Sequence, residues 1–250
     1  MNFTKQFVTR LVQCCALMSL AAFATTSLSA TGVEAGWVTT RFVHGHPEYQ
    51  KAGTATWTKL DQGMVLHAGD SIRCNHGSHA DLMLGYNNGN IQVSPDSEVL
   101  LDKLTYTHTG LEIIHDTQLS LKKGLLYGQV DKMANESKYQ VKTPKGVAGI
   151  RGTRYRIADN GDVTVSEGTV LVSVILADGT TKVYTVAAGN TFDYATGTVR
   201  TATPAEIVVV NDTTVDSETH GGAQNNIDPA SHKFFQDTGT EIFVSPTTSK

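Results

Sequence analysis

The sequence predicts an all-β protein: a single β-sandwich, roll or solenoid-like domain followed by an extended, polar C-terminal tail. Beyond the first thirty residues, short runs rich in Val, Ile, Thr and Tyr recur, and clusters of Gly, Asn, Asp and Pro separate them. Apolar and polar residues alternate in several of these runs. No window of twelve residues beyond that N-terminal stretch has helical periodicity, and no repeat of constant length is visible.

Each expected strand is bounded by turn-forming residues. Asn-Gly and Asp-Gly pairs at residues 87–90, 159–162 and 177–180 predict tight hairpins, because these residues tolerate the positive φ angles of such turns. After Thr153, alternation places Arg154 and Arg156 on one face of a strand and Tyr155 and Ile157 on the other. The expected strands are residues 36–43, 80–84, 90–93, 98–106, 111–121, 125–130, 139–143, 154–158, 162–166, 169–176, 182–186 and 191–194.

Residues 1–30 have the pattern of a cleavable signal peptide. Lys5 and Arg10 supply a positive start, an uncharged apolar stretch follows over residues 11–23, and small residues lead to cleavage points after Ser29, Ala30 or Ala35. The apolar stretch is shorter than the roughly 20 residues that a bilayer-spanning helix needs. We therefore expect export to the periplasm, the extracellular space or the cell surface, with no transmembrane span after cleavage.

Charge and cysteine content restrict the classes of protein further. Removing residues 1–30 takes away Lys5 and Arg10 and changes the formal net charge from −4 to −6, which argues against a nucleic-acid partner. Cys74 is the one cysteine beyond the signal, so an ordinary hydrophobic core has to stabilise the fold. We expect a β domain over residues 31–200 and a polar, partly disordered tail over residues 201–250.

One segment carries a family resemblance. Residues 141–157 read VKTPKGVAGIRGTRYRI, in which a strand ends in Thr-Pro, a Val-Ala pair follows, and Arg-Gly-Thr leads into a new strand. This order resembles the FecR domain family, which is named for the regulator of ferric citrate transport. The flanks agree over about residues 36–194, at residues 69–72, 77–82, 91–99, 119–130, 163–172 and 186–191.

The resemblance implies an exported module in a family linked to envelope signalling through protein contacts. Family members that act as transmembrane anti-sigma regulators carry a cytoplasmic domain and a spanning helix before this module. This sequence has a signal peptide there instead, so the resemblance does not transfer a direct anti-sigma role. Structural assembly at the cell surface is the alternative, and the two roles differ in whether the contacts are to another protein or to further copies.

The Thr-Pro to Arg-Gly-Thr segment also has a physical reading of its own. Pro144 lacks an amide donor and ends a strand, and Gly146, Gly149 and Gly152 permit a tight corner between core strands. The cations around it form a basic stretch in an acidic protein, suited to an acidic protein or an anionic envelope glycan. These candidate partner-binding residues are Lys142, Lys145, Arg151, Arg154 and Arg156.

Catalytic and metal sites have weaker support. Cys74, His76 and His79 are residue types that bind zinc or copper, but no second Cys/His pair has the matching spacing. No nucleophile elbow, phosphate-binding glycine loop or calcium loop is present in the sequence. We therefore expect a non-enzymatic protein without a cofactor, with metal binding as a lesser alternative.

Overall fold

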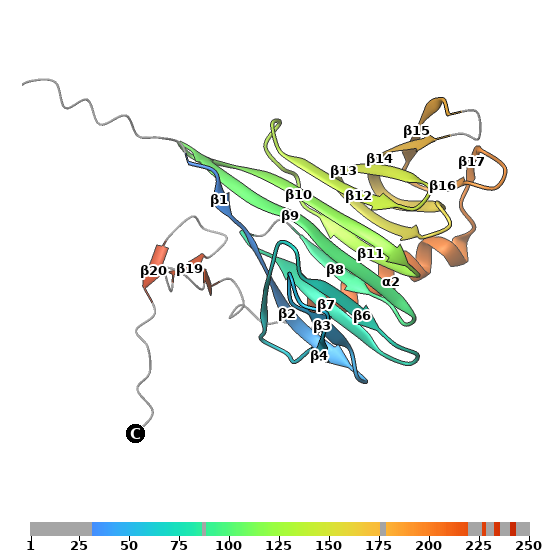
Figure 1. The fold of residues 1–250 in the computed structure, drawn as a ribbon. Coiled ribbons are helices and arrows are strands. Elements are labelled where there is room, and N and C mark those ends of the chain that lie inside the picture. Colours follow the sequence, from blue (N-terminus) through green and yellow to red (C-terminus); the bar gives the residue numbers. More distant parts are fainter. Residues whose placement is uncertain are drawn as a thin grey trace, which may run out of the picture. The chain divides into compact units, whose positions relative to one another are not determined.

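A computed structural model describes residues 32–86, 89–175, 179–219, 227–228, 233–235 and 241–243 of the 250-residue chain (Figure 1). It confirms the all-β class: the described part holds one helix, α2 (Pro204–Thr219), and many strands. The strands of the main sheet are β1 (Glu34–Ala35), β2 (Trp37–His44), β3 (Glu48–Gln50), β4 (Trp57–Lys59), β5 (Val65–His67), β6 (Ser71–Cys74), β7 (His79–Leu84), β8 (Asn90–Val93), β9 (Ser97–Thr109), β10 (Glu112–Lys123), β11 (Leu125–Val130), β12 (Lys138–Thr143), β13 (Gly146–Ala158), β14 (Val163–Ile175), β15 (Thr181–Ala187), β16 (Asn190–Asp193) and β17 (Thr198–Thr201). A separate small sheet contains β18 (Ile227–Asp228), β19 (Lys233–Phe235) and β20 (Glu241–Phe243).

The main sheet branches at β13. Residues 146–149 of this strand pair with β12, and residues 153–158 pair with β11. One arm continues from β12 through β10, β9, β6, β3 and β4, and the other continues from β11 through β8, β7, β2 and β5. The β10–β12 pair is parallel and its neighbours are antiparallel, so the sheet is mixed. Among the described residues no series of strand pairings reconnects the two arms, so the sheet is open.

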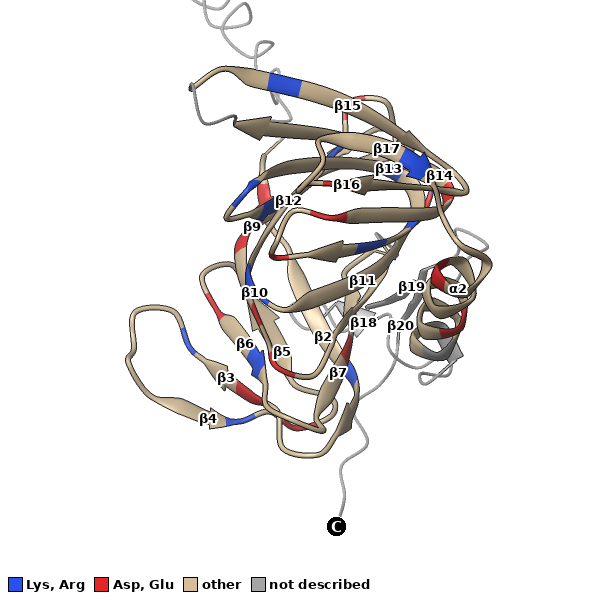
Figure 2. Ribbon diagram, turned by 90° about the vertical axis from the view of Figure 1, so that its right-hand side faces the viewer, with Lys and Arg blue, Asp and Glu red and all other residues tan. Residues whose placement is uncertain are grey.

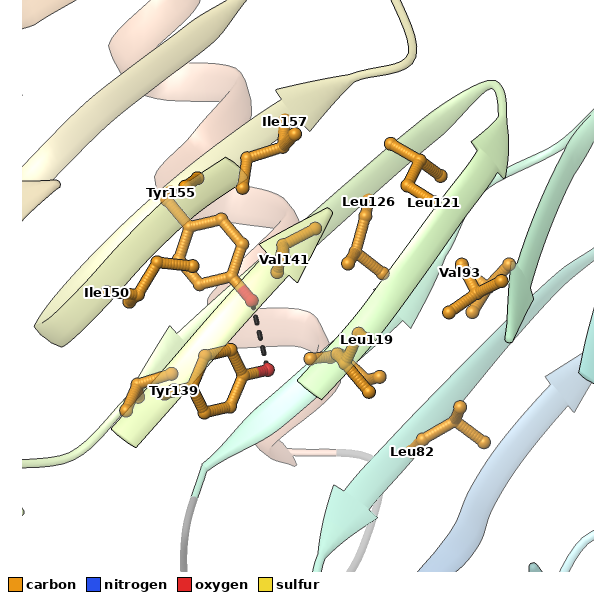
Figure 3. Close-up of a cluster of buried hydrophobic side chains, with 14 of the residues drawn as sticks. Leu82, Val93, Leu119, Leu121, Leu126, Tyr139, Val141, Ile150, Tyr155 and Ile157 are labelled. Carbon is orange, nitrogen blue, oxygen red and sulfur yellow. Dashed lines mark hydrogen bonds between the residues drawn. The ribbon is translucent and has the colours of Figure 1, made fainter. Parts of the chain in front are cut away.

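The hydrophobic core lies between the two arms. Leu82 and Leu126 come from one arm, Leu119 and Val141 from the other, and all four belong to one buried cluster (Figure 3). Tyr155 of β13, where the arms meet, is fully buried in the same cluster. This arrangement fits the expected sandwich or roll better than a regular solenoid, because facing layers share one core.

Comparison with the predicted strands shows where alternation misleads. The predicted strands over residues 80–130 are confirmed, with boundaries that shift by a few residues. Antiparallel pairing of β7 with β8 and of β14 with β15 confirms two of the predicted hairpins, whose turns lie partly outside the described residues. The expected corner over residues 144–153 is wrong. β12 ends at Thr143, but β13 already begins at Gly146 and continues through Gly149 and Gly152. Likewise, the strands predicted at 162–166 and 169–176 are one strand, β14.

The prediction of an extended tail without a helix is also wrong over residues 204–219. There the chain forms α2, which lies beside β8, β11, β13 and β14 (Figures 1 and 2). The run of β-branched residues from Ile207 to Val210 favours a strand locally. Helix formation is instead started by a capping box: the Thr203 hydroxyl accepts the Glu206 N–H (3.3 Å), and the Glu206 carboxylate accepts the Thr203 N–H (2.7 Å).

An ion pair stabilises the start of α2, so the stability of this helix is expected to depend on pH. Two guanidinium N–H groups of Arg200 donate to the Glu206 carboxylate at 2.7 and 3.0 Å. These bonds and those from Thr203 hold the pKa of Glu206 at about 2, below its ordinary value of 4.5. A carboxylate with a lowered pKa stabilises the fold above its unfolded-state pKa, and the contribution is lost as the pH falls.

We therefore expect α2 to lose helical signal between about pH 4.5 and pH 2. Far-ultraviolet circular dichroism of the wild type and of Glu206→Gln checks this, because the variant has no carboxylate to protonate. The expected result is a difference between the two proteins that shrinks as the pH falls through this window. A constant difference would contradict the role of the Glu206 charge.

Candidate partner-binding face

The Arg-Gly-Thr sequence forms a β-bulge in β13, opposite Gly168 of β14. Gly152 and Gly168 have φ angles of 59° and 80°, a backbone conformation that residues with a Cβ atom rarely adopt. The Thr153 hydroxyl lies 3.1 Å from the Arg151 carbonyl oxygen and 3.0 Å from that of Thr169, and it accepts the Thr169 N–H at 3.3 Å. This hydroxyl replaces ladder bonds that the bulge interrupts, so the motif has a structural role.

The bulge also decides which side chains of β13 face outward. Before it, Ala148 and Ile150 are buried; after it, Tyr155 and Ile157 are buried, so the alternation shifts by one residue. Arg151 therefore faces outward just beyond residues 146–149, the part of β13 that pairs with β12. Arg154 faces outward farther along the strand, where β13 pairs with β11.

The five predicted basic residues do not form one patch. Lys142 lies 3.4 Å from the Asp102 carboxylate, and Lys145 sits in the turn after β12 with its ammonium 5.4 Å from the centre of the Tyr194 ring. Arg151 is exposed and donates to the Asn135 side chain. The two remaining arginines lie on the later part of β13: Arg154 donates to Glu167 and to Thr214 of α2, both at 3.2 Å, and Arg156 is half-buried.

A different surface brings part of this set together with apolar residues. We call it the β12–β15 face: the outward side chains of β12, the first half of β13, the second half of β14, and β15. Leu171, Ile175 and Val183 are 52%, 63% and 60% exposed on it. The pairing of Ser173 with Val183 places Leu171 and Ile175 diagonally next to Val183, within reach of it. Such a cluster of exposed aliphatic side chains is typical of a contact surface.

A shallow groove of about 430 Å³ lies beside this aliphatic cluster. Gly149 is part of its lining: an added Cβ there would have one neighbour within 4 Å, the Leu171 carbonyl oxygen at 3.8 Å. Lys138 and Arg151 supply positive charge along the groove, and Leu171 supplies an apolar wall. The groove therefore suits a partner with both acidic and aliphatic side chains.

The candidate metal ligands are not assembled. Cys74 is the last residue of β6 and is buried, and burial raises the pKa of its thiol to about 12, so the thiolate that a metal requires is disfavoured. The His76 side chain is exposed and contacts Asp96 at 3.3 Å, whereas His79 lies on β7 and stacks on His44. Within the described residues, no group of three metal-binding side chains occurs.

Comparison with protein families identifies the central part of this fold. The family model described as FecR protein matches residues 70–171, which run from just before β6 into β14 and include the bulge. Residues 70–171 of the chain match a FecR domain. The predicted family resemblance is thereby confirmed over residues 70–171, and β15 lies beyond this matched part.

Other comparisons give distant likenesses. Two crystal structures of a protein assigned as an anti-sigma factor from Parabacteroides distasonis ATCC 8503 match with TM-scores of 0.39 and 0.38 at 14% identity. Each match covers 53% of this chain and 58% of that protein, so the chain spans little more than half of its length. None of the curated proteins is significantly similar in sequence. The described residues include no helix with the length and hydropathy of a membrane span.

The basic stretch in the sequence pointed to Arg151, but it gave no sign of the aliphatic part of the β12–β15 face. A signal was present: residues 170–175 read VLVSVI, with apolar residues at both even and odd positions. In a strand, this pattern indicates that both faces are covered, one by the core and the other by a further contact. The structure supplies a cover for Val170, Val172 and Val174, and leaves Leu171 and Ile175 exposed.

Proposed function

We propose that this chain is an exported, non-enzymatic FecR-domain protein that binds a protein partner in the cell envelope and takes part in signal transduction. The observation that carries the proposal is the β12–β15 face, where exposed Leu171, Ile175 and Val183 adjoin a groove with Lys138 and Arg151. The signal-peptide pattern supports export, and the family resemblance supports a role in envelope signalling.

A protein partner accounts for this surface better than a glycan does. Burying exposed aliphatic side chains against another apolar surface stabilises a complex by about 25 cal/mol per Å² of apolar area removed from water. Anionic glycans offer charge to Lys138 and Arg151 but no apolar cover for Ile175 and Val183. A partner with aliphatic and acidic side chains matches both parts of the face.

Chemical cross-linking in the native envelope tests the proposal. We expect an adduct between this chain and a different protein, and a roughly tenfold loss of that adduct in Leu171→Asp, which places a charge in the aliphatic cluster. Leu111→Asp is the matched control, because Leu111 is fully exposed in the turn between β9 and β10. Cell fractionation of the same cultures is expected to find a chain that begins at residue 30, 31 or 36 outside the cytosol.

Other outcomes would contradict the proposal in distinct ways. Adducts that contain further copies of this chain alone would favour structural assembly at the surface. An adduct with a glycan would contradict the assignment of a protein partner. Equal adduct yields for the wild type and Leu171→Asp would contradict the assignment of the β12–β15 face as the binding surface. A full-length chain in the cytosol would contradict export.

A further inference from the structure

We propose that β15 is a strand-addition edge, to which an extended segment of the partner protein pairs with alternating aliphatic and acidic side chains. This inference rests on the proposed function and deepens it. It specifies the backbone conformation and the side-chain pattern of the segment that is bound.

The first argument is the open edge of β15. β15 pairs with β14 over seven residues, from the Thr169–Ala187 pair to the Ile175–Thr181 pair, and no second strand pairs with it among the described residues. The other strands that end a branch of the main sheet, β1, β4, β5 and β17, have two to four residues each. An edge strand turns half of its N–H and C=O groups away from its neighbour, and a second chain can pair with these groups. β15 is therefore the longest such template in the described structure (Figure 1).

The second argument is the side-chain pattern beside that edge. Val183 is 60% exposed on the β12–β15 face and has Leu171 and Ile175 as diagonal neighbours, so a residue paired with it gains apolar contact. Lys182 points to the opposite face of β15, where its ammonium lies 4.7 Å from the centre of the Tyr184 ring. An acidic residue next in the added strand would lie beside Lys182.

These two neighbours define the pattern of the bound segment. Because successive side chains of a strand point to opposite faces, an aliphatic residue opposite Val183 is followed by an acidic residue opposite Lys182. Lys182 is exposed and has no acidic partner in an ion pair within the described structure. Lys138 of β12 and Arg151 of β13 lie across the face, on the far side of β14 from β15, and acidic residues of the partner beyond the added strand would meet them.

A short peptide tests strand addition directly. The probe is a ten-residue, fluorescently labelled peptide in which valine and glutamate alternate, and fluorescence anisotropy with the mature protein measures its dissociation constant. Two further probes carry N-methyl groups on alternate backbone amides, one set for each edge of the peptide strand. We expect one methylated probe to bind at least tenfold more weakly and the other to bind like the parent, because one edge of an added strand faces β15.

Charge exchange provides the second arm. Lys182→Glu is expected to weaken binding of the valine–glutamate peptide at least fivefold and to strengthen binding of the corresponding valine–lysine peptide. Val215→Asp is the control for altered surface charge, since Val215 is exposed on α2. Its affinity for both peptides is expected to equal that of the wild type.

The results separate this inference from the proposed function. Strand addition is contradicted by no saturable binding at roughly 1 mM peptide, by equal effects of the two methylation patterns, or by an unchanged preference in Lys182→Glu. If the envelope adduct still depends on Leu171 in any of these cases, the proposed function stands without strand addition. If the adduct is also insensitive to Leu171→Asp, both proposals fail.

Discussion

Tyr155→Ala is expected to lower the free energy of unfolding by about 3–5 kcal/mol, the range measured when large buried aromatic side chains are truncated. Tyr155 is fully buried in the cluster where both arms of the sheet meet (Figure 3). Its hydroxyl lies 3.1 Å from that of Tyr139, which is 2% exposed. The truncation therefore leaves a cavity and also an unpaired buried hydroxyl. Urea denaturation followed by tryptophan fluorescence measures the change.

A double-mutant cycle separates these two costs. Tyr155→Phe keeps most of the volume but leaves the Tyr139 hydroxyl without this partner, at a cost of about 1–3 kcal/mol. Tyr139→Phe in the same protein removes the unpaired group, so the double variant is expected to be less destabilised than the sum of the single variants. Additive effects would show that the hydroxyls do not interact. A Tyr155→Ala variant as stable as the wild type would contradict the position of the core.

Gly168→Ala is expected to destabilise the protein by about 3 kcal/mol or more, because two sources of strain coincide. The φ angle of 80° is unfavourable for alanine, and a Cβ atom would lie 2.2 Å from the Gly152 carbonyl oxygen. This oxygen belongs to the backbone of the bulge, so it cannot move aside as a flexible side chain would. Thermal and urea denaturation of the purified variant measure the loss.

Gly149→Ala is the matched control in the same pair of strands. Gly149 has no positive φ angle, and its Cβ position has no atom closer than 3.8 Å. We expect its stability to lie within about 0.5 kcal/mol of the wild type. Equal destabilisation by Gly149→Ala and Gly168→Ala would contradict the bulge geometry and leave the Arg-Gly-Thr motif without this explanation.

The strand pattern was predictable where alternation and turn residues agree. The run from Leu125 to Val130 and the Asn-Gly turn before Asn90 need no distant contact to be recognised. A β-bulge is not visible in such a pattern, because the bulge at Gly152 shifts the alternation of buried and outward side chains in β13 by one residue without ending the strand. The helix α2 was missed for a related reason: Ile207–Val210 resembles a strand locally, and the capping signal at Thr203, Pro204 and Glu206 is short.

The candidate site was predictable in part. Charge drew attention to Arg151, but pairing across the sheet decides which cations share a surface with it. Arg154 is only three residues away in sequence and contacts Thr214 of α2 instead. The aliphatic cluster depends on the register between β14 and β15, which sets Leu171 and Ile175 beside Val183. The sequence alone does not fix that register.

Site-specific photo-cross-linking in living cells tests the central claim most directly. A photoactivatable amino acid replaces Leu171 in one strain and Leu111 in another, so that each probe reports only what lies within reach of its own position. We predict an adduct with a different envelope protein from position 171 and none from position 111. No adduct from position 171, or the same adduct from both positions, would contradict the assignment of the β12–β15 face as the partner-binding surface.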